Sequence, residues 1–241
     1  MNVTIPDKKL FLTSFLLPIS KINDSCVIYL DKNGFSCTVA TSDASVILYS
    51  SYKLNLKVEN LIALNISDIK KVIKAFEGIG GDSFTFLVDK NNISYFGTDV
   101  RFKYHLLEDG IINKPKIDIN KINTLEFPVN FTIQYKTILD LLRGSTFATE
   151  SNKLYLYTEN GKIIGDLTDK SRHNVDSISI PIADFTGTLN SMCLNFELIR
   201  IISGVRVKQL QCSINPKIGI ILFHVSDNIV TTKYIASSLI K

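Results

Sequence analysis

The chain has 241 residues, 45% of them hydrophobic and 21% charged, and its formal net charge is +4. This length suffices for one large or two medium domains, and the composition excludes a disordered or fibrous chain. The net charge is too small for a claim of nucleic-acid binding to rest on the total. Only a local basic patch could support one.

The first patterned segment is KKLFLTSFLLPIS, residues 8–20, in which an apolar run follows two lysines. We reject a secretory signal, because Asp7 precedes the lysines, Pro18 interrupts the run and no small-residue cleavage site follows. No apolar stretch reaches the length of a membrane span. We therefore expect a helix over residues 10–22 of a cytoplasmic protein, with a kink or an early end at Pro18.

Residues 26–37, CVIYLDKNGFSC, predict a β-hairpin, because β-branched and aromatic residues flank Asn33-Gly34, a dipeptide typical of a type I′ turn. Residues 67–78, SDIKKVIKAFEG, then predict an amphipathic helix with Ser67 as its N-cap and Gly78 as its end. At about 100° per residue, its lysines share one face and its apolar residues the other. The lysines are Lys70, Lys71 and Lys74, and the apolar residues are Ile69, Val72, Ile73 and Phe76. Taken alone, the lysine face is most simply a solvated surface.

The second half of the chain repeats this order of elements. Asn160-Gly161 lies in a second predicted hairpin, and Asn33 and Asn160 are 127 positions apart, while Gly78 and Gly204 are 126 apart. Helices are predicted at residues 137–149 and 195–204, the hairpin at 153–164, and closing strands at 102–106 (FKYHL) and 232–236 (TKYIA). Such a repeat predicts two similar domains, residues 1–110 and 128–241, joined by residues 111–127 as an extended connector.

The sequence offers no anchor for catalysis. It contains no phosphate-binding glycine loop, zinc-protease helix or serine nucleophile elbow. The charged segment DLTDKSRH, residues 166–173, is predicted to be a solvated loop. The cysteines form no C-x-x-C pair and no zinc-ligand spacing with the histidines, so we expect free buried thiols at Cys26, Cys37, Cys193 and Cys212. We predict no enzyme, no metal and no cofactor.

The ordered repeat resembles the DNA sliding clamps, both PCNA and the clamps of T-even-type bacteriophages. Residues 141–164, LLRGSTFATESNKLYLYTENGKII, look like the corresponding helix and hairpin of the phage clamps, and KYIAS, residues 233–237, is similar to the last strand of PCNA. The resemblance implies an α+β fold of two similar domains, with helices lining the inside and antiparallel sheets outside a ring-shaped homotrimer. It places the strands between subunits near residues 102–110 and 174–182.

The resemblance also implies that basic residues line the hole and contact double-stranded DNA without sequence specificity. Two departures from the pattern are Leu16, which the repeat aligns with Arg143, and Glu197, an acid on the last helix. The DNA-facing residues implied are Lys9, Lys21, Lys70, Lys71, Lys74, Lys136, Arg143, Arg200, Arg206 and Lys208.

The partners implied are a DNA polymerase and an ATP-driven clamp loader, docked through a hydrophobic pocket beside the connector. Leu125 and Phe127 are the strongest candidates, because they are apolar residues in a polar connector. Val46, Ile218 and Ile235 are as compatible with ordinary core positions. The full set of partner-binding residues is Val46, Leu125, Phe127, Ile218, Tyr234, Ile235 and Ala236.

Two alternatives remain open. One is an open, non-ring viral processivity factor that binds DNA directly by charge. The other is a two-domain α+β interaction protein without DNA binding. The frequent Ile, Asn and Lys residues suggest an A+T-rich genome, and a bacteriophage source would place the protein in the host cytoplasm.

Overall fold

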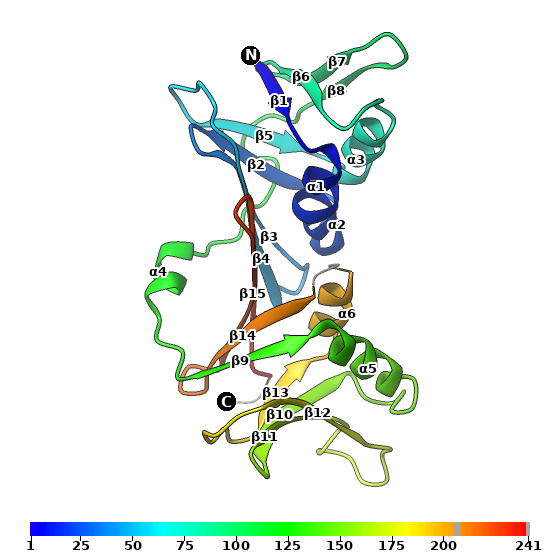
Figure 1. The fold of residues 1–241 in the computed structure, drawn as a ribbon, viewed down its shortest axis with the longest axis vertical. Coiled ribbons are helices and arrows are strands. Elements are labelled where there is room, and N and C mark those ends of the chain that lie inside the picture. Colours follow the sequence, from blue (N-terminus) through cyan, green and yellow to red (C-terminus); the bar gives the residue numbers. More distant parts are fainter. Residues whose placement is uncertain (205–207, 240–241) are drawn as a thin grey trace. The chain divides into compact units, whose positions relative to one another are not determined.

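The structure, a computed structural model, describes residues 1–204 and 208–239. The chain divides into two compact units (Figure 1). The first comprises Met1–Ile117 and Ser226–Thr232, and the second comprises Asp118–Val225 and Lys233–Lys241. Both units combine helices with antiparallel sheets.

The first unit contains two sets of four paired strands. One has the order β1-β6-β7-β8, formed by Asn2–Ile5, Phe84–Val88, Asn92–Phe96 and Arg101–His105. The other has the order β5-β2-β3-β4, formed by Ile62–Ile66, Cys26–Asp31, Gly34–Ala40 and Val46–Lys53. Within this unit, the backbone N–H of Lys53 donates to the carbonyl of Ile229 at 2.8 Å.

The helices of the first unit lie on one side of strands β2 and β5 in Figure 1. One continuous helical stretch comprises α1 (Lys8–Leu10), the π-helical η1 (Phe11–Leu16) and α2 (Leu17–Ile22), and α3 (Ile69–Glu77) packs beside it. The expected early end at Pro18 was wrong, because the helix continues to Ile22. The π-helical residues before Pro18 already depart from the ordinary hydrogen-bond ladder, which accommodates its missing N–H.

Aromatic rings hold these helices against the sheet. The ring of Phe11 lies 5.2 Å from that of Phe35 and 5.0 Å from that of Tyr52, which belong to β3 and β4. It also lies 6.3 Å from Phe76 of α3. These edge-on and tilted contacts bury large apolar areas and join the helices and the sheet in one core.

The second unit uses the same strand orders. One sheet has the order β12-β11-β10-β13, and β9, β14, β15 and β16 follow one another as β1, β6, β7 and β8 do. Its helices are α5 (Tyr135–Ser145) and α6 (Glu197–Ser203), which contact each other. The strands are β9 Val129–Gln134, β10 Lys153–Glu159, β11 Lys162–Leu167, β12 Ile178–Asp184, β13 Met192–Asn195, β14 Gln209–Asn215, β15 Ile220–Ser226 and β16 Val230–Ser237, and the first three residues of β16 belong to the first unit.

The two predicted hairpins end in different turns. In the second, Glu159 pairs with Lys162, and Asn160 and Gly161 both have positive φ, so the predicted type I′ turn is confirmed. In the first, Asp31 pairs with Gly34, so the loop residues are Lys32 and Asn33, and the Asn-Gly prediction was wrong there. Gly34 has φ 122°, and a Cβ on it would lie 2.2 Å from the carbonyl oxygen of Tyr52. Glycine is therefore required by the close approach of β4.

Two further expectations were wrong in detail. The N-cap of α3 is Asp68, whose side chain accepts from the N–H of Lys71 at 3.1 Å, whereas Ser67 shares a hydrogen bond with the Tyr104 hydroxyl. A carboxylate at this position also suits the positive end of the helix dipole. The connector is not extended throughout, because it contains α4 (Ile119–Thr124), capped by Asp118. No helix within the described ranges is long and apolar enough to cross a membrane.

Candidate nucleic-acid interface and strand edges

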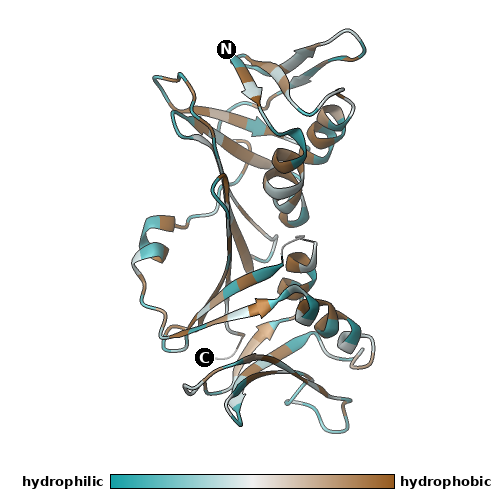
Figure 2. Ribbon diagram, in the orientation of Figure 1, coloured by the Kyte–Doolittle hydropathy of each residue, from teal (hydrophilic) through white to brown (hydrophobic). Residues whose placement is uncertain are grey.

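The lysine face of α3 is exposed, and its apolar face is buried. Ile69, Val72, Ile73 and Phe76 are all at most 8% exposed, which confirms the predicted amphipathic helix. In Figure 2, α3 accordingly carries both brown and teal residues. The exposed residues of α3 are Lys70, Lys71, Lys74 and Glu77.

These lysines are only loosely held. Lys70 pairs with Asp24 at 2.6 Å, and Lys71 lies 3.7 Å from the N-cap Asp68. Lys74 forms no ion pair with any described residue. Because exposed pairs of this kind are weak, the ammonium groups of Lys70 and Lys71 can exchange their carboxylate partners for another anion. Lys9 and Lys21, on the neighbouring helical stretch, are exposed as well.

The helices of the second unit carry basic residues with acids beside them. Arg143 pairs with Asp140 at 3.0 Å, and Arg200 pairs with Glu197 at 3.1 Å, each acid lying one helical turn earlier. Arg200 also bonds the Asn152 side chain at 2.9 Å. Each pair lowers the local positive charge. The remaining predicted residues of this unit are the exposed Lys136 and Lys208, and Arg206, which lies outside the described residues.

Strands β8 and β12 are two of the edge strands of the described sheets. Within the described part of the chain, β8 pairs only with β7, and β12 pairs only with β11. Edge strands of this length present unpaired N–H and C=O groups that can pair with another chain. Both strands overlap the regions that the resemblance assigned to the subunit contact, although residues 174–177 precede β12 and are not strand.

The predicted partner-binding residues differ in exposure. Val46, Tyr234, Ile235 and Ala236 are at most 6% exposed, and burial raises the pKa of Tyr234. Ile218 is 51% exposed. The residues of intermediate exposure are Leu125 and Phe127. Val46 belongs to the first unit, and the other six belong to the second.

Within the second unit, hydrogen bonds fix the connector against two strands. Asn215, at the end of β14, donates from its side chain to the carbonyl of Glu126 at 2.7 Å. Its own side-chain oxygen accepts the N–H of Ile218 at 3.2 Å. Lys233 of β16 donates to the side chain of Asn123. The structure therefore brings the connector beside the β14–β15 turn, where Ile218 is exposed.

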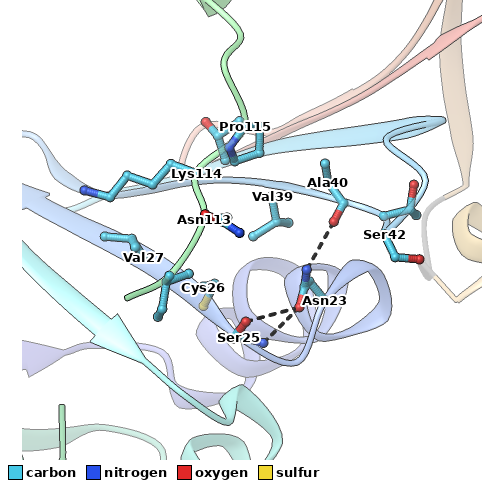
Figure 3. A pocket seen from close by; sticks show the side chains of 13 residues that line it. Asn23, Ser25, Cys26, Val27, Val39, Ala40, Ser42, Asn113, Lys114 and Pro115 are labelled. Atoms are coloured by element: carbon cyan, nitrogen blue, oxygen red, sulfur yellow. Dashed lines mark hydrogen bonds between the residues drawn. The ribbon is translucent and has the colours of Figure 1, made fainter. Parts of the chain in front are cut away.

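A pocket of about 290 Å³ in the first unit was not predicted. Figure 3 shows Asn113, Lys114 and Pro115 of the connector crossing β2 and β3 beside it. The Lys114 ammonium lies 5.2 Å from the centre of the Tyr29 ring, a cation–π contact that fixes this crossing. The Asn23 side chain donates a hydrogen bond to the carbonyl of Ala40 and accepts one from the N–H of Ser25. Sequence reasoning missed the pocket because it depends on where the connector lies on the sheet.

The charged side chains of segment 166–173 form ion pairs with other side chains of the second unit. Asp169 accepts from the Lys153 ammonium at 2.6 Å, and this hydrogen bond lowers the pKa of Asp169 to about 2. Lys170 pairs with Asp166 at 3.6 Å, and Arg172 pairs with Glu150 at 3.6 Å. Among the described residues, no group of three or more His, Cys, Asp or Glu side chains could hold a metal ion. The cysteines are free and buried, as predicted.

The solved structures that match the chain over its full length include two of PCNA proteins. One, described as the C-terminal region of FEN-1 bound to A. fulgidus PCNA, matches at 12% identity with a TM-score of 0.77 and covers 100% of this chain and 98% of that chain. The other, a PCNA2-PCNA3 complex from Sulfolobus tokodaii, matches at 12% identity with a TM-score of 0.72 and covers 100% of both chains. No family model and no curated protein matches the sequence. The likeness establishes the fold, which is the α+β clamp fold of PCNA.

Proposed function

We propose that this chain is the subunit of a DNA sliding clamp, which acts by encircling duplex DNA and not by catalysis. Three copies would join head to tail in a closed ring and tether a replicative polymerase to its template. The observation that carries the proposal is the likeness of the whole chain to PCNA structures, including a complex of two PCNA subunits. Head-to-tail contacts that close after three steps give cyclic symmetry. We propose residues 1–110 and 128–241 as the two clamp domains.

The exposed basic residues of the helices support a DNA-facing inner surface. A clamp must hold the phosphate backbone loosely, because tight or base-specific contacts would prevent sliding. Exposed lysines on helices meet this requirement. The resemblance of residues 141–164 to phage clamps supports a bacteriophage protein that works in the host cytoplasm.

The decisive measurement is the mass in solution. Light scattering should give three times the subunit mass of 27.0 kDa at micromolar concentration. Retention on circular DNA should require an ATP-driven loader and be lost when the circle is cut. A monomer that is never retained would overturn the proposal. Direct, strongly salt-dependent binding to linear duplex would instead identify the open processivity factor.

For partner docking, we propose Leu125, Phe127 and Ile218 as the contact surface, with Val46, Tyr234, Ile235 and Ala236 forming the core beneath their own sheets. A polymerase or loader peptide would bind there through apolar anchors. Phe127→Ala should weaken the binding of such a peptide at least about tenfold. Phe147→Ala removes a 58% exposed phenylalanine elsewhere in the same unit and is the matched control. Equal losses in both variants would remove Phe127 from the docking surface.

A further inference from the structure

In the first unit, β4 contacts the segment that leads into β16, and this contact can serve as a template for other strands of the repeat. Lys53 donates from its backbone to the carbonyl of Ile229, so these two residues lie opposite each other in hydrogen-bonded positions. The hydroxyls of Ser50 and Thr232 lie 3.2 Å apart and are buried. Ser50 therefore lies opposite Thr232. Because it is three residues from Lys53, it occupies a non-hydrogen-bonded position, where side chains are closer.

Residues 178–181 of β12 correspond one by one to part of β4, and a register shift in the β11–β12 pairing follows them, where Ile182 is an extra residue. The pairs Asp31–Gly34 and Glu159–Lys162 close the two hairpins, so Gly34 corresponds to Lys162. Three residues further on, Cys37 pairs with Ser50 and Gly165 pairs with Ile180. Ile180 therefore takes the place of Ser50. By the same count, Ile178 takes the place of Leu48.

Strand β8 corresponds in the same way to the beginning of β16. The turns before them close alike, since Gly97 N–H donates to Val100 at 3.0 Å and Asp227 N–H donates to Val230 at 2.9 Å. Phe102 lies two residues after Val100, and Thr232 lies two residues after Val230. The next two residues are Lys-Tyr in both strands. Phe102 therefore takes the place of Thr232.

The resemblance already places β8 of one copy beside β12 of the next; from these two correspondences we propose the register of that antiparallel contact, with Phe102 opposite Ile180 and Tyr104 opposite Ile178 of the partner subunit. This inference rests on the proposed ring. In this contact a Phe–Ile pair takes the place of the hydroxyl pair Ser50–Thr232. The contact between copies is thus closed by an apolar cluster that is half-exposed in the single chain.

The side chains of both strands satisfy the rule that opposite residues share a face of the sheet. Phe102 faces the helices, because its ring lies 5.8 Å from that of Phe76. Ile178 and Ile180 also face the helices, because each lies within 3.2 Å of a Cβ built on Gly144 of α5. A slip of one residue would bring Phe102 opposite an outward-facing residue. The shared face therefore excludes every odd slip.

Pro181 fits the same register. It pairs with Ile164 where Ser51 pairs with Ser36, so it corresponds to Ser51. Residues two apart on a strand direct their N–H groups to the same side, and Lys53 directs its own toward Ile229. Pro181 would therefore face the next copy, and it has no N–H to donate. The contact between copies therefore lacks a backbone donor at this position, which makes the apolar cluster its main source of affinity.

Disulfide trapping tests this register. In a non-hydrogen-bonded pair the Cα atoms are about 4.5 Å apart, inside the range that a disulfide spans, whereas a diagonal neighbour is about 7–8 Å away. The test variant carries Phe102→Cys and Ile180→Cys, and the matched control carries Phe102→Cys and Ile178→Cys. The four native cysteines are buried and stay in both. Mild oxidation should convert most of the test variant, and several-fold less of the control, to covalent trimers.

The outcomes separate the register from the ring. Equal or faster cross-linking of the control overturns the register. A mass of three subunits without cross-linking in either variant overturns the β8–β12 contact while the ring survives. A monomeric native protein overturns both. As a second variant, Phe102→Thr with Ile180→Ser recreates the Ser50–Thr232 pair, and it should raise the trimer dissociation constant at least about tenfold. An unchanged constant would also overturn the proposed cluster.

Discussion

The helices of the two units occupy equivalent positions in the same strand framework, but they differ in charge. Those of the first unit, Lys8–Ile22 and Ile69–Glu77, contain six lysines and one glutamate. Helices α5 and α6 of the second contain three basic and two acidic residues, and each arginine is paired with an acid on its own helix. The repeat thus conserves geometry and leaves charge free to vary. In the proposed clamp, the first unit would therefore supply most of the attraction for DNA.

The largest expected effect comes from reversing the charges of the first unit. Replacing Lys70, Lys71 and Lys74 together by Glu should lower the affinity for a short duplex at least about tenfold. The slope of log affinity against log salt concentration should fall by up to about three, because up to three phosphate contacts are lost. Fluorescence anisotropy at low salt measures both quantities. The matched variant reverses Lys136, Arg143 and Arg200 in the second unit and should lose less. A larger loss in the second unit would contradict the asymmetry.

A second expected effect concerns how α5 packs. A Cβ on Gly144 would lie 3.1–3.2 Å from side chains of Leu167, Ile178 and Ile180. Gly144→Ala should therefore lower the free energy of unfolding by about 1–3 kcal/mol through overpacking, more than the helix propensity of alanine restores. Urea unfolding measures the loss. Gly161→Ala, at a turn where a Cβ would meet open space, separates crowding from the cost of a positive φ. A stabilised Gly144→Ala variant would show that α5 can move away from the sheet.

Much of this arrangement could be predicted from the sequence, because it follows from local periodicity. The apolar and basic faces of residues 69–77, the hairpin at Asn160-Gly161 and the closing strands are all patterns within a dozen residues. The order of these patterns, repeated once, was sufficient to predict the clamp fold. The ten basic residues were chosen from the resemblance, and the chain shows nine of them, all exposed.

The errors arose where a distant segment decides the local structure. Asn33-Gly34 looks like a type I′ turn, but the approach of Tyr52 on β4 displaces the loop by one residue. The pairing of Arg143 and Arg200 with acids depends on rotamers that spacing alone does not fix. The pocket beside Lys114 depends on where the connector crosses the sheet. In each case the deciding contact joins residues that are not neighbours in sequence.

Removing the acid that pairs with one arginine of the second unit should reduce the difference in DNA attraction between the two units by a smaller amount. Glu197→Gln removes the acid beside Arg200, while Asn152 and the Phe196 ring, 5.2 Å from the guanidinium, still hold that side chain in place. DNA affinity at low salt should rise about twofold to fivefold, because one exposed charge is freed. Glu150→Gln, which releases Arg172 away from the helices, is the control. Equal gains in both variants would mean that only net charge matters.

The smallest expected effect tests the same tendency of the second unit to pair its charges, now outside its helices. The hydrogen bond from Lys153 lowers the pKa of Asp169 from 3.8 to about 2, so the ionised form is favoured in the folded state. A lowered folded pKa contributes stability above pH 3.8, and that contribution is lost as pH falls toward 2. Thermal unfolding should therefore show a steeper loss of stability between these values in the native protein than in Asp169→Asn. The difference should be small, because the pair is partly exposed. Asp99→Asn, an exposed acid in the β7–β8 turn, should follow the native curve. If Asp169→Asn does so too, the pair contributes nothing to stability and the charges of this loop are only solvated.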